Sequence, residues 1–313
     1  MKIGITVGDV RGPVTLTEVI TQARTAADAG FTTAWSAQAF GWDALTALAV
    51  TGTQVPGIEL GTAAVSAPQR HPLTLASQAL TVQAAVGHRF TLGIGAGIAM
   101  MVQNMFGLPT DRPAYRMREY LSVLRPLLRG ESVTHHGETL TAVGAVNAPG
   151  TQPPPVLLSA LGPAMLGIAG ELADGTITWM TGPKTLADHV VPSISKAALA
   201  AGRAAPRVVA GLLVSVTNDE AAIRGRVAEQ FALAGQVPEY RAMLDREGAA
   251  GPQDVAVVGD QNAVARHLQR LADAGVTDFI ASPFGSTAEQ DRAIATLADL
   301  ASGSRHTTVT PAR

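Results

Sequence analysis

The sequence of 313 residues contains no cysteine and is poor in charged side chains, which make up 15% of it. Without cysteine the protein has no disulfide, no thiolate nucleophile and no cysteine-ligated metal, so its fold depends on packing. Positive charge is not in excess either, because a formal net charge of −2 gives no basic field for a nucleic-acid backbone or an anionic membrane. We therefore expect no nucleic-acid or membrane partner and favour a small-molecule substrate.

A long apolar run is missing from the N-terminal segment. The run Ile3–Val7 is interrupted by Gly4 and stops at Gly8 and Asp9, so it fits neither a signal-peptide core nor a membrane span. We expect a cytoplasmic protein. The seven histidines also lack the spacing of a metal site, so we expect no metal.

Runs of β-branched residues alternate with segments of helical periodicity along most of the chain, an order typical of a parallel sheet with crossover helices. Strands are expected at Ile3–Val7, Thr33–Ala37, Ile58–Val65, Phe90–Gly95, Val156–Ala160, Thr176–Met180, Val208–Thr217 and Asp278–Ser282. Open doubly wound sheets more often have five or six strands, so this count and the chain length favour a closed (β/α)8 TIM barrel.

The helices have clear sequence signals. Leu16–Ala29 ends at Gly30 and Asn262–Ala274 ends at Gly275, and a glycine directly after a helix is a frequent C-terminal stop. Arg116–Leu128 places apolar residues at helical spacing and is expected to be an outer barrel helix.

Two segments are too long for simple barrel loops. Gly130–Pro155, after strand four, and Ala221–Val258, after strand seven, are interpreted as insertions, and no barrel strand is expected in the second. Extra material after a strand usually builds the lid or the substrate pocket of a barrel. We expect residues 1–301 to form one barrel domain and residues 302–313 to be a flexible tail.

A glycine-rich turn follows the fourth expected strand, within the segment from Arg89 to Gly97. Gly95 and Gly97 have no Cβ, so a flat ring or a phosphate can approach their backbone. A dinucleotide-binding fingerprint fails here, because Gly95, Gly97 and Met100 give G-x-G-x-x-M, where a Rossmann turn needs glycine or alanine. The turn therefore indicates a different ligand-binding arrangement.

Several motifs, in their order and spacing, resemble those of the bacterial luciferase-like flavin and deazaflavin oxidoreductases, and most closely the coenzyme F420-dependent members of actinobacterial type. The matching segments are Arg70–Pro72, Gly87–Phe90, Leu92–Gly97, Arg116–Leu121, Ser159–Pro163, Ala173–Gly175, Thr178–Gly182 and Ala274–Phe279. The resemblance implies a (β/α)8 barrel that binds an isoalloxazine-type ring at the carboxyl ends of its strands.

The resemblance also implies where the cofactor lies. The ring is expected on a bulge in the third strand, often with a non-proline cis peptide, at Ala63 and Ala64. The phosphate is expected near the ends of strands five and six, where backbone N–H groups, a hydroxyl and a positive charge are available. The implied cofactor-binding residues are Gln38, Ala63, Ala64, Gly95, Gly97, Ser159, Ala160, Leu161, Gly162, Thr181, Gly182 and Lys184.

Several of these assignments have an ordinary structural alternative. Residues 62–65 can simply be a buried strand of small residues, and Gly162 with Pro163 can simply begin a helix. Lys184 can be a solvated surface charge. His71 is open to two interpretations, a proton donor facing the pocket or a structural residue that orders the barrel rim.

The sequence departs from one branch of the family it resembles. Sugar-phosphate dehydrogenase members carry an Asp-His pair and a glutamate where this chain has Gln38-Ala39 and Ile98. Alcohol oxidation of that kind is disfavoured because no imidazole or carboxylate remains there to remove a proton. Ile98 and the residues after it, up to Met101, instead predict an apolar surface against which the substrate lies.

Three hypotheses for function follow. The first is an F420-dependent oxidoreductase that transfers a hydride between the deazaflavin ring and a largely apolar small organic substrate. The second is an FMN-dependent luciferase-like monooxygenase, and the third is a flavin-binding barrel without catalysis. The family resemblance implies a homodimer, and the sequence identifies no catalytic residue.

Overall fold

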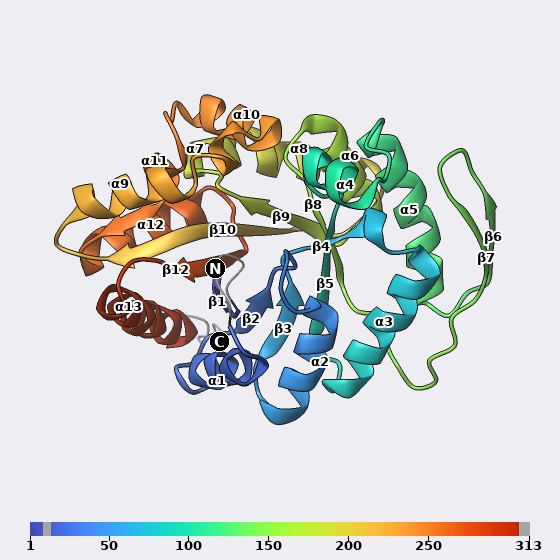
Figure 1. Cartoon of the computed structure of the whole chain (residues 1–313), viewed down its shortest axis with the longest axis horizontal. Helices are drawn as coiled ribbons and strands as arrows, with labels where there is room; N and C mark the ends of the chain where they lie inside the picture. Colours follow the sequence, from blue (N-terminus) through green and yellow to red (C-terminus); the bar gives the residue numbers. More distant parts are fainter. Residues whose placement is uncertain (9–13, 307–313) are drawn as a thin grey trace, which may run out of the picture.

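Eight parallel strands form a closed barrel in the computed structural model, which describes residues 1–8 and 14–306, the last four of these by their backbone only (Figure 1). Around the barrel the strands are β1 (Lys2–Thr6), β2 (Thr33–Ser36), β3 (Glu59–Thr62), β5 (Phe90–Gly95), β8 (Val156–Ser159), β9 (Gly175–Trp179), β10 (Arg207–Val216) and β12 (Asp278–Pro283). β12 pairs with β1 and closes the ring. The predicted (β/α)8 TIM barrel is confirmed, and each of the eight expected strands is present.

Helices surround the barrel as its outer layer. They are α1 (Leu16–Asp28), α2 (Ala44–Gln54), α3 (Pro72–Ala85), α5 (Pro113–Leu128), α6 (Pro163–Leu172), α8 (Val191–Ala200), α12 (Gln261–Asp273) and α13 (Thr287–His306). α1 begins with a capping box between Thr15 and Glu18, and it stops before Gly30, whose φ is +84°. Within the described ranges, no helix combines the length and apolar character that a membrane span requires.

The C-terminal helix runs further than the sequence indicates. α13 continues to His306, past the expected start of the flexible tail at residue 302. Residues 307–313 lie outside the described residues, and for them the flexible tail stays a prediction.

Apolar side chains fill the inside of the barrel. One buried cluster consists of residues from five different strands, namely Trp35, Leu157, Ile177, Val209 and Ile280. Alternate residues of a barrel strand point inward, so a cluster drawn from many strands is its interior. A Cβ on Gly61 would lie 2.3 Å from the indole ring of Trp35, so the glycine makes room for this large side chain.

A polar cluster closes the amino end of the barrel. Arg207 at the start of β10 forms an ion pair of 2.7 Å with Asp278 at the start of β12. Its other guanidinium nitrogen donates to the hydroxyl of Thr91 on β5, at 3.2 Å. Because β8 and β9 separate β5 from β10 in the sheet, this side chain reaches across the barrel. We call Arg207, Asp278 and Thr91 the floor.

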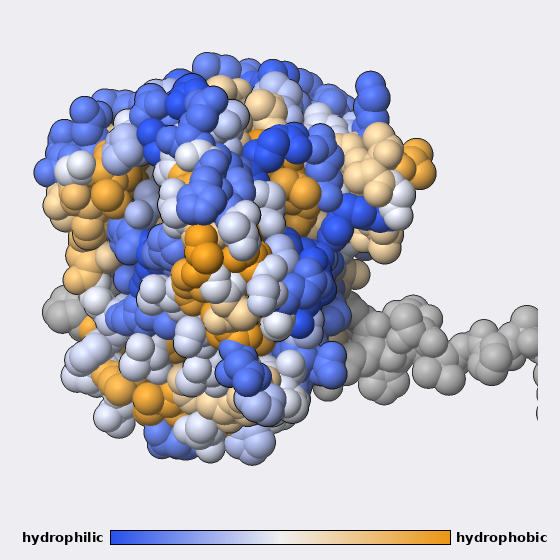
Figure 2. Space-filling model, turned by 90° about the vertical axis from the view of Figure 1, so that its right-hand side faces the viewer, coloured by the Kyte–Doolittle hydropathy of each residue, from blue (hydrophilic) through white to orange (hydrophobic). Residues whose placement is uncertain are grey.

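The first insertion is a β-hairpin that packs along the outside of the barrel. Its strands are β6 (Val133–His136) and β7 (Thr141–Gly144), and it lies beside α3 and α5 (Figure 1). The carboxylate of Glu119 on α5 accepts hydrogen bonds from the N–H groups of Glu138 and Thr139 in the turn of the hairpin. Figure 2 shows this side of the molecule, where apolar side chains gather among hydrophilic ones.

The second insertion contains helices and an unexpected strand. Its elements are α9 (Glu220–Gln230), η3 (Ala234–Gln236), α10 (Pro238–Glu247), α11 (Pro252–Val255) and β11 (Val257–Gly259). The expectation of no barrel strand in this segment holds, because β11 is not one of the eight strands of the ring and pairs in parallel only with Val214–Val216 of β10. β10 pairs with β9 only over residues 207–211, which leaves an edge for β11 to cover. Three residues are too short to give a strand signal.

Candidate functional site

The third barrel strand breaks at the position where the cofactor ring is expected. β3 ends at Thr62, the peptide between Ala63 and Ala64 is cis, and β4 (Val65–Ser66) then continues beside β5. The N–H of Ala63 donates to the carbonyl oxygen of Ser36, and the carbonyl oxygen of Ala64 accepts from the N–H of Gln38 at 3.3 Å. The structure therefore brings Gln38, Ala63 and Ala64 together, at the carboxyl ends of β2 and β3.

The glycine turn meets two neighbouring strand ends. A Cβ on Gly95 would lie 3.2 Å from Cβ of Ser159 on β8. Gly97 has a φ of +74°, and a Cβ on it would lie 3.0 Å from Oγ of Ser66 on β4. Cγ2 of Val102 would lie even closer to this Cβ, at 2.6 Å, so packing within the chain leaves room only for bare backbone at Gly97. We call the carboxyl ends of the barrel strands, with these glycines, the mouth.

A buried hydroxyl near the mouth, Oγ of Ser66 on β4, has no hydrogen-bond partner in the described part of the chain. Buried polar atoms are almost always hydrogen-bonded, and an exception calls for an explanation. Sequence reasoning missed Ser66 as a site residue, because only the pairing of β4 with β5 places it beside Gly97.

The first half of the predicted phosphate site lies at the start of α6. Ser159 ends β8, and Ala160 and Leu161 lead to Gly162, which precedes Pro163 at the first helical position. No side chain caps this helix, so its first N–H groups have no side-chain acceptor. The ring of His189 binds the carbonyl oxygen of Leu161 at 2.8 Å and holds the loop in place.

The second half of the predicted phosphate site contacts another part of the chain. The hydroxyl of Thr181 donates to the carbonyl oxygen of Trp179, and Gly182 precedes the short helix α7 (Pro183–Thr185). The ammonium group of Lys184 donates to the carbonyl oxygen of Arg246 at 2.8 Å. Lys184 is an exposed residue whose ammonium group is held by this backbone carbonyl group, and its binding of phosphate stays a prediction.

A buried arginine fixes the side chain of Gln38. The guanidinium group of Arg70, with its side chain only 10% exposed, donates to Oε1 of Gln38 at 2.8 Å and to the carboxylate of Asp43. Burial raises the pKa of Asp43, but hydrogen bonds from Thr46 and the charge of Arg70 outweigh it, so this pKa lies below its ordinary value. The Gln38 side chain is therefore a positioned group, and only its backbone reaches Ala64.

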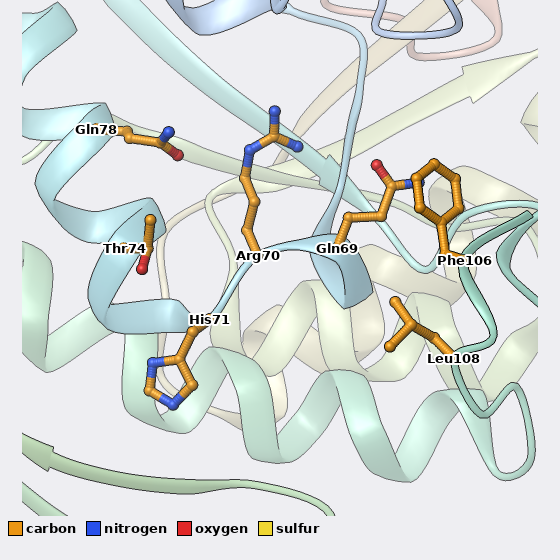
Figure 3. Close-up of a pocket in the computed structure, with 7 residues that line it drawn as sticks. All are labelled: Gln69, Arg70, His71, Thr74, Gln78, Phe106 and Leu108. Carbon is orange, nitrogen blue, oxygen red and sulfur yellow. The ribbon is translucent and has the colours of Figure 1, made fainter.

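A cavity of about 490 Å³ lies beside the mouth, between the start of α3 and the end of α4 (Ala99–Phe106). Figure 3 shows Arg70 between residues of α3 on one side and apolar residues on the other. The cavity is lined by Gln69, Arg70, His71, Thr74, Gln78, Phe106 and Leu108. None of the predicted cofactor residues lines it, so this cavity is not the predicted cofactor site.

His71 has a structural position at this cavity. Its Nδ1 accepts from the N–H of Leu73 at 3.3 Å and caps α3, and its Nε2 binds the carbonyl oxygen of Thr141 in the hairpin at 2.8 Å. Both ring nitrogens are engaged. The contacts agree with the rim-ordering interpretation of His71.

Exposed apolar side chains follow two barrel strands at the mouth. Phe40 and Trp42 come after β2 and are 64% and 54% exposed, and Met100 on α4 is 63% exposed. Large apolar side chains that are more than half exposed often mark a binding surface when they gather. Among the described residues, no group of three or more candidate metal ligands lies together.

Comparison with known proteins connects this fold and site to a family. The model of the luciferase-like monooxygenase family matches residues 1–278. A Mycobacterium tuberculosis protein, named provisionally as a coenzyme F420-dependent oxidoreductase, is 28% identical over 95% of this chain and 99% of its own length. The 5,10-methylenetetrahydromethanopterin reductase of Archaeoglobus fulgidus is 27% identical over 83% of this chain and 88% of its own.

A solved structure confirms the fold. The coenzyme F420-dependent tetrahydromethanopterin reductase of Methanopyrus kandleri superposes with a TM-score of 0.76 and 24% sequence identity. The superposition covers 95% of this chain and 97% of that protein.

Proposed function

The chain belongs to the luciferase-like monooxygenase family, and on that premise we propose that it is an oxidoreductase dependent on coenzyme F420. The mycobacterial relative named for this coenzyme matches this chain over nearly its whole length. The observation that carries the proposal is the uncharged cradle at the mouth, where Ala63 has only a methyl group and Gly95 and Gly97 have no side chain. Such a cradle fits a flat ring.

The residues at the mouth would have different roles in binding the cofactor ring. Ala63 and Ala64 would support the ring, and the bare backbone of Gly95 and Gly97 would let it lie close. The unpartnered hydroxyl of Ser66 would hydrogen-bond a polar edge of the ring. Reduced deazaflavin, when bound, supplies a hydride, and the chain supplies orientation and exclusion of water.

The phosphate of the cofactor would bind at the start of α6. Residues Ser159–Gly162 lead into a helix whose first N–H groups have no side-chain acceptor. Helix N-termini of this kind stabilise a phosphate through their N–H groups and dipole. We also propose Thr181, Gly182 and Lys184 as neighbours of the phosphate.

The substrate we propose is a largely apolar small organic molecule that exchanges a hydride with the ring. Phe40, Trp42 and Met100 offer exposed apolar surface beside the strand ends. Positions 38 and 98 hold glutamine and isoleucine, and neither side chain can act as a base. The alcohol oxidation of the sugar-phosphate branch therefore has no base at those positions.

Cofactor titration of the purified protein tests the proposal. We expect F420 to bind stoichiometrically and nicotinamides not to bind, measured by fluorescence and calorimetry. FMN is the alternative, because the family is named for monooxygenases. Stoichiometric binding and turnover with reduced FMN, and none with F420, would replace the proposal with a monooxygenase. Tight F420 binding without hydride loss to any reducible compound would favour a non-catalytic carrier.

We also propose a cytoplasmic homodimer. α2 and α3 contain no charged side chain over 11 and 14 residues. Their exposed positions are Thr46, Thr53, Gln54, Thr74, Ser77, Thr81, Ala84 and Ala85. Depletion of charge is a feature of interface cores. Light scattering should give twice the mass of 32.2 kDa, and a monomer at micromolar concentration would contradict the dimer.

A further inference from the structure

A glutamate from the second insertion occupies the start of α7, where part of the cofactor phosphate is expected. α7 and α10 lie side by side (Figure 1), and Glu247 is the last residue of α10. Its carboxylate accepts hydrogen bonds from the N–H of Lys184 at 3.2 Å and from the N–H of Thr185 at 2.7 Å. Two adjacent backbone donors therefore already hold an anionic group.

The residues around this carboxylate leave room for it and form further hydrogen bonds between α7 and α10. A Cβ on Gly182 would lie 2.3 Å from the carboxyl carbon of Glu247, so only glycine permits the contact. The hydroxyl of Thr185 donates to the carbonyl oxygen of Met243 one helical turn earlier, at 3.2 Å. Lys184 points its ammonium group at the carbonyl oxygen of Arg246. The joint between α7 and α10 is thus made of matched polar contacts.

The helix that begins at these donors adds a dipole that favours an anion at its N-terminus. α7 continues through the π-helical segment Leu186–Val190 into α8, so residues 183–200 form one helical run. The positive end of its dipole faces Glu247. A carboxylate and a phosphate cannot share two N–H donors, because each needs them and both are negative.

We propose that Glu247 is a specificity-determining residue that denies the N–H groups of Lys184 and Thr185 to the cofactor phosphate. The phosphate then depends on the start of α6 for its backbone donors. This inference rests on the proposed function, since it concerns the phosphate of the bound cofactor. Replacing Glu247 with a smaller residue should open a second anion-binding position.

The test compares two ligands that differ in the phosphate arm. Dissociation constants for F420 and for the same deazaflavin without its phosphate are measured by fluorescence in wild type, Glu247→Ala and Glu247→Gln. We expect Glu247→Ala to bind F420 at least about fivefold more tightly, with the phosphate-free ring unchanged to within about twofold. Glu247→Gln, which loses the charge but keeps an acceptor, should show a smaller gain.

Glu239→Ala is the matched control, because Glu239 is an exposed glutamate on the same helix. It should leave both dissociation constants at their wild-type values. An equal loss of affinity for both ligands in Glu247→Ala would make Glu247 a structural latch and overturn the proposal. Unchanged F420 affinity would overturn it as well. If Glu247→Ala does not fold, Glu247→Gln decides between the same outcomes.

Failure of the proposed function is recognised separately. If wild type binds neither deazaflavin, the function is wrong, and FMN and riboflavin then provide the same pair with and without phosphate. If no flavin binds, inorganic phosphate is the probe. It should raise the melting temperature of Glu247→Ala above that in chloride of equal ionic strength, and leave wild type unaffected. An identical response of the two proteins would overturn the role of Glu247.

Discussion

The two ends of the barrel differ in whether their polar groups find partners within the chain. At the floor, Arg207, Asp278 and Thr91 satisfy one another through an ion pair and a hydrogen bond. At the mouth, Gly95 and Gly97 have no side chain, and the neighbouring buried hydroxyl of Ser66 lacks a partner in the described structure. Groups at the floor are complete without a ligand, whereas groups at the mouth are not. In barrels of this type the amino end contributes stability and the carboxyl end carries the function.

Arg207→Met breaks the floor and has the largest expected effect on stability. It leaves the carboxylate of Asp278, with a side chain 7% exposed, without its counter-ion. Removal of one partner of a buried pair costs about 3 to 5 kcal/mol, which urea unfolding at pH 7 would measure. The double variant with Asp278→Asn should recover part of the loss. A free energy of unfolding within about 1 kcal/mol of wild type would show that the floor is not a stability element.

Glu289→Gln tests a charged group at the rim of the mouth. Glu289 accepts from the N–H and hydroxyl of Ser286, from Arg226 and from Thr217. The backbone hydrogen bond from Ser286 is the main cause that lowers the pKa of Glu289 to about 2. The variant should lose about 2 kcal/mol of stability at pH 7.

The pH dependence of this effect has a definite sign. A carboxyl whose pKa is depressed in the folded state stabilises it fully above the unfolded pKa, here 4.5, and loses that contribution as the pH falls toward 2. The difference between wild type and Glu289→Gln should therefore shrink between these pH values in denaturant titrations. A difference that stays constant down to pH 2 would contradict the charge-based account.

Gly95→Ala fills the cradle at the mouth. The added methyl group lies 3.2 Å from Cβ of Ser159, so stability should fall by no more than about 1 kcal/mol. Binding of the cofactor should weaken about tenfold, or 1.4 kcal/mol, as measured by fluorescence titration. Gly167→Ala makes the same change on α6 in open space and should not alter binding. Equal binding by both variants would separate Gly95 from the cofactor site.

Ser66→Ala and Thr91→Val compare an unpartnered hydroxyl with a partnered one. Ser66 at the mouth has no partner in the described structure, so its loss should leave stability unchanged or slightly higher. Thr91 at the floor accepts from Arg207, so its loss should cost about 1 kcal/mol. Cofactor affinity should fall about threefold in Ser66→Ala and stay constant in Thr91→Val. The reverse pattern would remove the distinction between the two ends.

Local signals were sufficient to predict the barrel and the glycine turn. The periodicity of apolar residues indicates the alternation of strands and helices. Gly30 and Gly275 follow the ends of their helices and have positive φ, as expected. β11 escaped prediction because its three residues form a strand only by covering the free edge of β10. The third expected strand is interrupted at residues 63–64, a break that only the family resemblance indicated.

Contacts between distant residues could not be predicted from the sequence. Glu247 lies more than 60 positions from the N–H groups it binds, and no motif marks it. Arg70 reaches Gln38 across 32 positions, so the sequence shows a basic residue but not the group it holds. The candidate cofactor residues follow from motif positions, whereas their neighbours depend on strand register and on the docking of the insertion.

The floor also limits how the chain can acquire its structure. Arg207 bonds to Asp278, 71 positions later, and to Thr91, 116 positions earlier. A growing chain that has not yet produced β12 has no carboxylate to meet this guanidinium group, which then stays in water. We therefore expect closure of the ring and burial of this charge to occur together, and fragments that stop before β12 to keep Arg207 solvated.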